Sequence, residues 1–422
     1  MKQTMNIPAM VRVKQHFDTH SIQDIPATVR AELSKIALEE IITPGHSVAI
    51  TAGSRGVANI KTILAEVVSE LKRIGAKPFI VPAMGSHGGA TAEGQKRIIE
   101  HYGITEAAMG VPIKSSMEVV EIGTTSEGVP VLLDRNAYQS DHIVVVNRVK
   151  PHTDFKAEIE SGLIKMMAIG LGKQKAADHY HNVFMRLGHY RILVSVAREI
   201  MRQCPIAFGL ALVENQKDET EIIQAIPTNK IEETERELLI KAKGYLPRIP
   251  FDPIDLLIID EMGKDISGTG MDQNVIARTV VPYHQVPSRP KITRIFVRDL
   301  SVGSEGNAIA IGNADFTTRR LVDKIDHQAT YINAITSSCP EAVRIPPYFE
   351  SDREVLDVAI NTIGDIKAED ARIVHIRNTL NLEEMYISEN MLPEVNDLDG
   401  VSIKGSPAPM VFDTQGNLIS DL

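Results

Sequence analysis

The chain has 422 residues, of which 43% are hydrophobic and 24% are charged. This composition is typical of a soluble globular protein, and the length exceeds one ordinary core, so we expect two domains. The net charge of -10 and the pI near 5.8 argue against nucleic acid and against an anionic membrane as the main partner.

Cysteine usage and hydropathy narrow the class of protein further. Cys204 and Cys339 are the only cysteines, which excludes a disulfide framework and a cysteine-based zinc cage. No stretch approaches the roughly 18 apolar residues that a membrane span needs, and the first residues lack the apolar core of a signal peptide. We therefore expect a reduced, cytoplasmic protein with no membrane partner, and a homo-oligomer is compatible with these features.

The first half of the chain alternates predicted strands and helices. Short apolar runs predict strands at 46–51, 77–83, 142–147 and 205–213, of which 142–147 is the fully apolar kind found in buried parallel sheets. Apolar residues that recur every three or four positions predict helices at 57–75, 91–103 and 231–244. Thr91 is the expected N-cap of the second helix.

Three prolines between 245 and 253 predict an interdomain hinge. After it the alternation restarts, with strands expected at 255–260, 291–297 and 371–376 and helices at 316–335 and 351–364. The pattern predicts an α/β fold with two domains, mostly parallel sheets and an active-site cleft between the domains. We expect an N-terminal cofactor-binding and catalytic domain at 1–248 and a C-terminal domain at 253–394 that closes over the substrate. The tail at 395–422 is expected to pack back onto the first domain.

Polar residues follow the ends of the predicted strands, where open α/β sheets bind their ligands. Ser54 and Arg55 follow the first strand, His87 follows the second, His152 follows 142–147, and Lys264 follows 255–260. Because parallel strands bring such loops to one edge, His87, His152 and Arg55 are expected to converge. The alternatives without a function are that each histidine is a surface residue and that Ser54-Arg55 is only a capped turn. A glycine-bearing turn that opens a helix also offers N–H groups to an anion.

Lys165 is a single amine inside an apolar run, next to Ile164 and Met166. A lysine in such a place either extends its amine to solvent or is desolvated and loses part of its affinity for a proton. Downstream, His179 and His181 alternate on an expected helix, where they would point to different faces. One of the two is therefore the better guess for a ligand.

The sequence resembles the nickel-dependent lactate racemase family, in a branch distinct from true lactate racemases. The matching segments are GSRG (53–56), MGSHGGATAEG (84–94), VNRVKPHTDFKAEIESGLIK (146–165), the histidine at 181, and GKDISGTGMDQNV (263–275). The resemblance implies a nickel-pincer nucleotide cofactor, which is the nickel complex of pyridinium-3,5-bisthiocarboxylic acid mononucleotide.

Residue by residue, the resemblance implies that Lys165 is the covalent tether of this cofactor. His181 is the implied nickel ligand, with His179 in reserve, and His87 and His152 form the implied acid/base pair. Three properties of the sequence fit these roles. An apolar surrounding favours a neutral, nucleophilic amine, and Gly170-Leu171-Gly172 provides a break that lets the chain return. Nickel accepts sulfur and imidazole ligands, so one histidine can complete a site built mainly by the cofactor.

The resemblance further implies a racemase or epimerase, an isomerase that moves hydride from a 2-hydroxy acid to the cofactor and back. Arg55 would hold the substrate carboxylate or the cofactor phosphate, and Ser54 would contact the cofactor. In the second domain the segment departs from that of lactate racemases. Lys264, Asp272 and Asn274 are the expected substrate-binding residues there, and they suit a 2-hydroxy acid larger than lactate.

Two alternatives of different classes remain open at the level of sequence. One is a divalent-metal hydrolase that uses His87, His152 and His181 as ligands for an activated water. The other is a non-catalytic protein that binds or carries the nucleotide cofactor.

Overall fold

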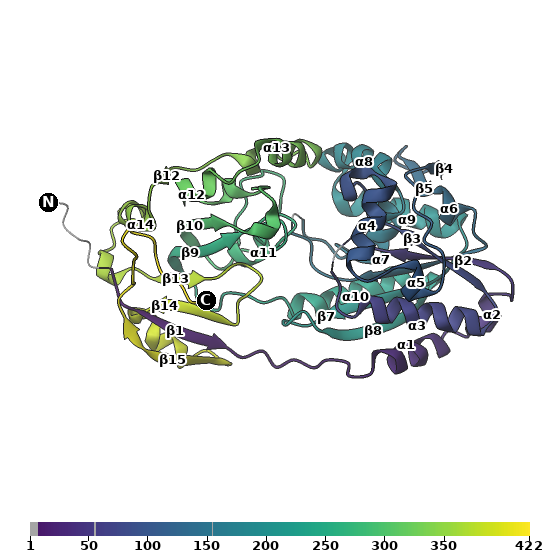
Figure 1. Cartoon of the computed structure of the whole chain (residues 1–422), viewed down its shortest axis with the longest axis horizontal. Coiled ribbons are helices and arrows are strands. Elements are labelled where there is room, and N and C mark those ends of the chain that lie inside the picture. The colour runs from purple at the N-terminus through teal and green to yellow at the C-terminus, as the bar shows by residue number, and fades with distance from the viewer. Residues whose placement is uncertain (1–6, 55, 154) are drawn as a thin grey trace. The chain divides into compact units, whose positions relative to one another are not determined.

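The computed structural model describes residues 7–54, 56–153 and 155–422. The chain divides into two compact units, Thr19–Leu246 and a second unit that combines the chain up to Asp18 with Pro247–Leu422 (Figure 1). Each unit has a sheet of mostly parallel or mixed strands covered by helices, so the predicted α/β class is confirmed.

The unit of residues 19–246 is built on a five-stranded sheet with the order β3-β2-β6-β7-β8. Its first four strands run parallel, and β8 closes the edge antiparallel to β7. A separate hairpin is formed by β4 and β5. The strands are β2 Ser47–Ala52, β3 Lys77–Pro82, β4 Val119–Thr124, β5 Pro130–Asp134, β6 His142–Arg148, β7 Ile206–Glu214 and β8 Thr220–Pro227.

The helices of this unit are α1 Ile25–Ser34, α2 Leu38–Ile41, α3 Ile60–Arg73, α4 Ala92–His101, α5 Glu106–Met109, α6 Arg135–Tyr138, α7 Leu163–Lys165, α8 Lys173–Leu187, α9 His189–Gln203 and α10 Ile231–Gly244. Three of them, α3, α4 and α10, were predicted from periodicity. A π-helical turn, Met166–Gly170, continues α7. Thr91 caps α4 as expected, because its hydroxyl accepts a hydrogen bond from the Gly94 amide at 3.0 Å.

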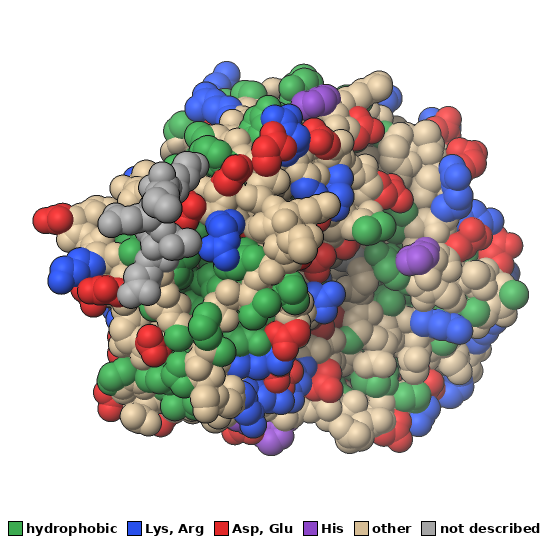
Figure 2. Space-filling model, turned by 60° about the vertical axis from the view of Figure 1, so that its left-hand side comes forward, with side chains coloured by type: hydrophobic (Ala, Val, Ile, Leu, Met, Phe, Trp, Pro, Cys, Tyr) green, Lys and Arg blue, Asp and Glu red, His purple; other side chains and the backbone are tan. Residues whose placement is uncertain are grey.

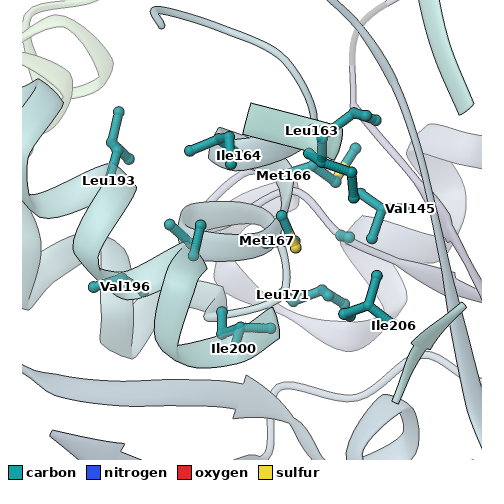
Figure 3. Packing of buried hydrophobic residues seen from close by; sticks show 14 of the residues in the cluster. Val145, Leu163, Ile164, Met166, Met167, Leu171, Leu193, Val196, Ile200 and Ile206 are labelled. Atoms are coloured by element: carbon teal, nitrogen blue, oxygen red, sulfur yellow. The ribbon is translucent and has the colours of Figure 1, made fainter. Parts of the chain in front are cut away.

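Both faces of the five-stranded sheet are buried, which explains why β6 is apolar without alternation. Val145 points into a core shared with α8, α9 and α10, whereas Val144 and Val146 point into a core shared with α1 and α3. The segment from Leu163 to Leu171 belongs to the first of these cores, where it packs among side chains of β6, β7 and α9 (Figure 3). The residues around Lys165 are therefore held by close packing on several sides.

The second unit has an eight-stranded mixed sheet with the order β12-β11-β10-β9-β13-β14-β1-β15. Strands β9 to β13 run parallel, and β14, β1 and β15 are antiparallel to their neighbours. The strands are β1 Met10–Gln15, β9 Ile254–Met262, β10 Ile292–Leu300, β11 Phe316–Thr318, β12 Tyr348–Phe349, β13 Ile373–Ile376, β14 Glu384–Ser388 and β15 Val401–Ala408. The helices are α11 Gln273–Ile276, α12 Arg319–Val322, α13 His327–Thr336, α14 Asp352–Ile360 and α15 Leu392–Val395.

The two ends of the chain differ from the expected domain boundaries. Strand β1 lies between β14 and β15, so the first strand belongs to the C-terminal unit and not to a domain of residues 1–248. The tail at 395–422 also joins this unit through β15. Beyond β15, the Leu418 amide donates to Asp352 at 2.8 Å and the Tyr386 hydroxyl donates to Asp421 at 2.6 Å. The prediction that the tail packs onto the first domain was wrong. Strand β15 of the tail pairs with β1, and a partner strand so distant in sequence cannot be identified from local patterns.

The segment predicted as one helix at 316–335 is a strand followed by two helices. Phe316–Thr318 forms β11 beside β10, and the hydroxyl of Thr318 then caps α12 by accepting from the Leu321 amide at 3.2 Å. Asp326 caps α13 in the same way through the Ala329 amide. Capping side chains end one element and start the next, which the apolar spacing alone does not reveal.

The units divide between Leu246 and Pro247, within the proline-rich segment predicted as a hinge, and also between Asp18 and Thr19. The predicted cleft between domains stays a prediction. Over the part of the chain that the structure describes, no helix is both long enough and apolar enough to cross a membrane. On the face shown in Figure 2, basic and acidic side chains are interspersed and do not form a single basic field.

Strand β1 generates a stability prediction. Val11 is fully buried in the core of the C-terminal unit, so Val11→Ala should lower the free energy of unfolding by about 2 kcal/mol through two lost methyl groups and the cavity they leave. Urea unfolding followed by circular dichroism measures this change. Lys14→Ala, on the same strand as Val11, is the matched control. It removes only a partly exposed ion pair with Glu383 and should have little effect. Equal effects of the two variants would contradict a structural role of β1.

Candidate functional site

Three predicted site residues of the first unit, Ser54, His87 and His152, lie on loops at the carboxyl edge of its parallel strands. Strand β2 lies between β3 and β6, so the loops after these three strands are neighbours. The π-helical turn lies against them: a Cβ on Gly53 would come 3.2 Å from Met166, and a Cβ on Gly85 would come 3.0 Å from Ile169. The loops after β2 and β3 are therefore packed directly against the segment that carries Lys165.

Lys165 and His152 are in direct contact. The Lys165 Nζ lies 2.6 Å from the His152 Nε2, and both side chains are partly buried. Burial of the imidazole, followed by the charges of Lys165, His189, Lys150 and Lys156, holds the pKa of His152 well below its usual range. His152 is thus a neutral ring at neutral pH, which accepts a hydrogen bond from the lysine.

A buried carboxylate holds the loop that carries His152. Glu160 is fully buried, and its Oε2 accepts from the backbone amide of His152 at 2.7 Å. Its Oε1 accepts from the Ala157 amide at 3.0 Å and pairs with Lys243 of α10 at 2.7 Å. A charge buried in this way is stable because it is paired and hydrogen-bonded, and it fixes the backbone at His152 and at Ala157.

A row of stacked rings runs from His152 toward His181. The centroids of His152 and Phe155 are 4.6 Å apart, and Phe155 stacks on His189 with an interplanar angle of 9°. His189 also lies 4.5 Å from Phe184, which in turn is 5.7 Å from His181 on α8. Three rings thus lie between the two predicted histidines. Their tilted and stacked contacts are energetically favourable arrangements of aromatic rings.

His87 lies on the loop after β3 and is exposed. The Ser54 hydroxyl, on the loop after β2, is hydrogen-bonded to His87 Nδ1. The structure therefore brings together two predicted residues from different loops. Because β3 and β6 are separated by one strand, their carboxyl ends are about 10 Å apart, which places His87 and His152 on either side of the end of β2.

The other predicted residues are placed as follows. Arg55 lies outside the described residues. His179 is on α8, next to Tyr180 with ring centroids 5.9 Å apart. Lys264 belongs to the second unit, where its amine donates to the Gly268 carbonyl at 2.8 Å.

Asp272 and Asn274 also belong to the second unit and contact each other. Asp272 caps α11, and its Oδ1 accepts from both the backbone and the side-chain nitrogen of Asn274, which is buried. The substrate-binding role expected for these two residues and for Lys264 stays a prediction.

Sequence reasoning missed three residues that surround the site: His189, Glu235 and Lys173. His189 follows Gly188, and a single histidine at a helix start gives no signal of the rings on both its sides. Glu235 occupies a position on α10 that turns toward the core together with Ile231 and Leu238, so a carboxylate on an apolar face was the available signal. Lys173 stands in the polar run KQK and is identified only by its burial.

Glu235 is a fully buried carboxyl group at the start of the helix that carries Lys165. Its Oε2 accepts from the Ile164 amide at 3.0 Å, and a Cβ on Gly162 would come 2.4 Å from its Oε1. Glycine is therefore required at 162 to admit the carboxyl group. Burial raises the pKa of Glu235 to about 7, against the opposing effect of the amides of Ile164 and Leu163.

Comparison with known proteins agrees with the fold. Residues 4–190 match the family described as the lactate racemase N-terminal domain. The matched domain is that of a racemase, the class of enzyme which the resemblance of the sequence implies. No curated protein sequence matches the chain.

Several solved structures are similar to this chain in fold, among them the following two. One is the lactate racemase apoprotein from Thermoanaerobacterium thermosaccharolyticum, with a TM-score of 0.51, 14% sequence identity, and coverage of 88% of this chain and 99% of that chain. The other is a protein from Thermotoga maritima, with a TM-score of 0.51, 14% identity, and coverage of 75% of this chain and 82% of that chain. At this identity the likeness establishes a common fold.

Glu235 generates a prediction about pH. Its pKa is raised on folding from an ordinary 4.5 to about 7, so its contribution to stability is complete below pH 4.5 and is lost as the pH rises through 7. The unfolding free energy should therefore fall over this range by up to about 3 kcal/mol relative to Glu235→Gln, which cannot ionise. Chemical unfolding of both proteins at several pH values measures the difference. Glu237→Gln, on the exposed side of α10, is the control and should show no such trend.

Proposed function

We propose that the protein is a nickel-pincer nucleotide-dependent racemase or epimerase of a 2-hydroxy acid larger than lactate. The observation that carries the proposal is the contact between Lys165 and His152, at the sheet edge where His87 also lies. An amine suited to covalent attachment stands next to a neutral imidazole suited to proton transfer. The match to a lactate racemase domain over residues 4–190 supports the same class.

The residues present fit the cofactor. Lys165 would hold it by an amide-type bond to its amine, and His181 would supply one imidazole to nickel, with His179 in reserve. The row of rings from His152 to His181 connects both residues in one cluster of ring contacts. When bound, the group supplies a hydride acceptor next to the substrate carbon.

The chain's own residues would move the protons. His152, kept neutral by burial, accepts the proton of the substrate hydroxyl at Nε2. Its pKa stays low after Lys165 is acylated, because burial is the largest cause and the charges of His189, Lys150 and Lys156 remain. His87, oriented by Ser54, serves the opposite face, since inversion at carbon requires a group on each side.

The substrate would be held by charged and polar groups. Arg55 would pair with the carboxylate, as argued from its charge and its place after β2. Lys264, Asp272 and Asn274 would bind the additional hydroxyl groups of a larger 2-hydroxy acid, with Asp272 as their acceptor. Lactate offers nothing to these groups, which is why a larger acid is proposed.

The alternatives receive less support. Within residues 7–54, 56–153 and 155–422, no three His, Cys, Asp or Glu side chains are grouped so that they could hold a metal ion. A hydrolase with a metal bound only by His87, His152 and His181 is therefore not favoured. A non-catalytic cofactor carrier would not need the pairing of a neutral imidazole with the tether.

Substitution of Lys165 and His152 separates attachment from turnover. In protein produced together with the cofactor pathway, Lys165→Ala should lose the covalent adduct and with it essentially all activity. His152→Gln should keep the adduct and lose about 10²–10⁴-fold in turnover, because it removes only proton transfer. Intact-mass spectrometry and a chiral assay measure the two properties. Lys175→Ala, an exposed lysine on α8, is the control. An adduct that survives in Lys165→Ala would disprove the tether.

Isotope labelling tests the path of the hydrogen. With the holoenzyme and its 2-hydroxy acid, deuterium at C2 should stay largely on carbon during inversion, because a hydride held on the cofactor does not exchange readily with water. Mass spectrometry of the product measures the retained label. Complete washout at the rate of inversion would indicate a carbanion formed by proton abstraction and would rule out hydride transfer.

A further inference from the structure

Lys173 is a second lysine near the site, and its side chain is fully buried. Three oxygens surround its ammonium group: Asp134 Oδ2 at 3.2 Å, Gln95 Oε1 at 3.2 Å, and the Pro82 carbonyl, which accepts a short hydrogen bond. The amine donates hydrogen bonds to Gln95 and Pro82 and forms an ion pair with Asp134. The charge is buried because it is paired within the protein.

The backbone is adapted to this arrangement. Lys173 has a φ of +57°, a left-handed conformation that is unfavourable for a non-glycine residue. The residue begins α8 after Leu171 and Gly172, which follow the π-helical turn, and its amine points inward. Asp134 receives it at the end of β5, where its backbone amide donates to the Leu171 carbonyl at 2.7 Å. Burial raises the pKa of Asp134 and lowers the pKa of Lys173, and each charge opposes the effect on the other.

Gln95 connects this ion pair to the loop of His87. Its amide nitrogen donates to the Gly85 carbonyl at 2.8 Å and to the His87 carbonyl at 3.3 Å, while its oxygen accepts from Lys173. Gly88 packs closely against the same turn of α4, because a Cβ on Gly88 would lie 2.6 Å from the backbone nitrogen of Gln95. Asp134, Lys173 and Gln95 therefore form one continuous buried relay that ends on the backbone of the His87 loop.

The other side of that loop contacts the segment of Lys165. The Gly85 amide donates to the Gly170 carbonyl at 3.3 Å, at the end of the π-helical turn. The relay thus starts at Lys173, shortly after this turn in the chain, and ends on the loop that is hydrogen-bonded to the turn. The relay and the Gly85–Gly170 hydrogen bond together fix the distance between the His87 loop and the π-helical turn more firmly than either would alone.

We propose that Lys173 is a positioning residue that, through Asp134 and Gln95, sets the place of His87 relative to the Lys165 segment. The proposal rests on the proposed function, in which these segments carry the proton donor and the tether. Lys173 itself touches no substrate. Its role is to replace flexibility of a glycine-rich loop, Gly85–Gly89, by a fixed backbone, since proton transfer needs heavy atoms within hydrogen-bond reach.

Two variants break the relay without leaving a lone buried charge. Gln95→Leu removes the donors to Gly85 and His87 and keeps the volume of the side chain. The double variant Asp134→Asn with Lys173→Met removes both charges, while the new amide still accepts from the Ala137 amide that Asp134 caps at 2.9 Å. Ser140→Ala is the matched control, because it deletes two buried hydrogen bonds, to Ala137 and His142, at the amino end of β6.

Hydrogen exchange and turnover together decide the proposal. In both relay variants the amides of residues 87–90 should exchange about tenfold faster than in the wild type, as expected for the loss of hydrogen bonds worth roughly 1 kcal/mol. In the holoenzyme kcat should fall by about 10²-fold while KM changes little, and the Lys165 adduct should remain. Ser140→Ala should change neither property.

Unchanged exchange at residues 87–90 in both relay variants would overturn the proposal, and so would faster exchange with an undiminished kcat. The exchange measurement needs no substrate, so it distinguishes this proposal from the proposed function. If the wild-type holoprotein racemises no 2-hydroxy acid, the proposed function fails, and faster exchange in the variants still supports the relay as the support of the loop.

Discussion

A short helix buried in an apolar core must find polar partners at both of its ends, because no water is there to bind its free amides and carbonyls. The segment Leu163–Leu171 meets this constraint with partners from outside the helix. Glu235 of α10 accepts from the Ile164 amide at its start, and the backbone amide of Asp134, whose buried carboxylate pairs with Lys173, donates to the Leu171 carbonyl at its exit. The arrangement of the loops around Lys165 depends on these two buried groups.

Much of the architecture could be predicted, because it is written in local patterns. The apolar run of β6, the three-and-four spacing of α3 and the cap Thr91 each depend on a few neighbouring residues. The site could be approached for the same reason. A strand end marks His87 and His152, and a single charge in an apolar run marks Lys165, so these candidate residues could be selected before their contacts were known.

The partners of these residues could not be predicted, because they are set by the fold and not by the neighbouring sequence. Lys173 lies in a polar run and reads as a surface lysine, yet it is the more deeply buried of the two amines. The glycines 170 and 172 predicted a break in the helix. The structure gives them close packing, with a Cβ on Gly170 only 2.9 Å from the Ala83 carbonyl, and places the left-handed residue at Lys173. A lysine in that conformation contradicts local preference and is explained only by its distant partners.

The place of β1 also has a consequence for how the chain is made. The unit of residues 19–246 is one continuous stretch and can fold as it leaves the ribosome, whereas the other sheet cannot be completed until β14 and β15 have been synthesised. Closing so long a loop costs little extra free energy but delays folding. Until then, Val11 and Val13 are exposed on a strand whose two edges are both unpaired and can pair with another chain. Strand exchange between two copies of the chain is therefore easiest during the interval after β1 has been synthesised and before β14 and β15 have been.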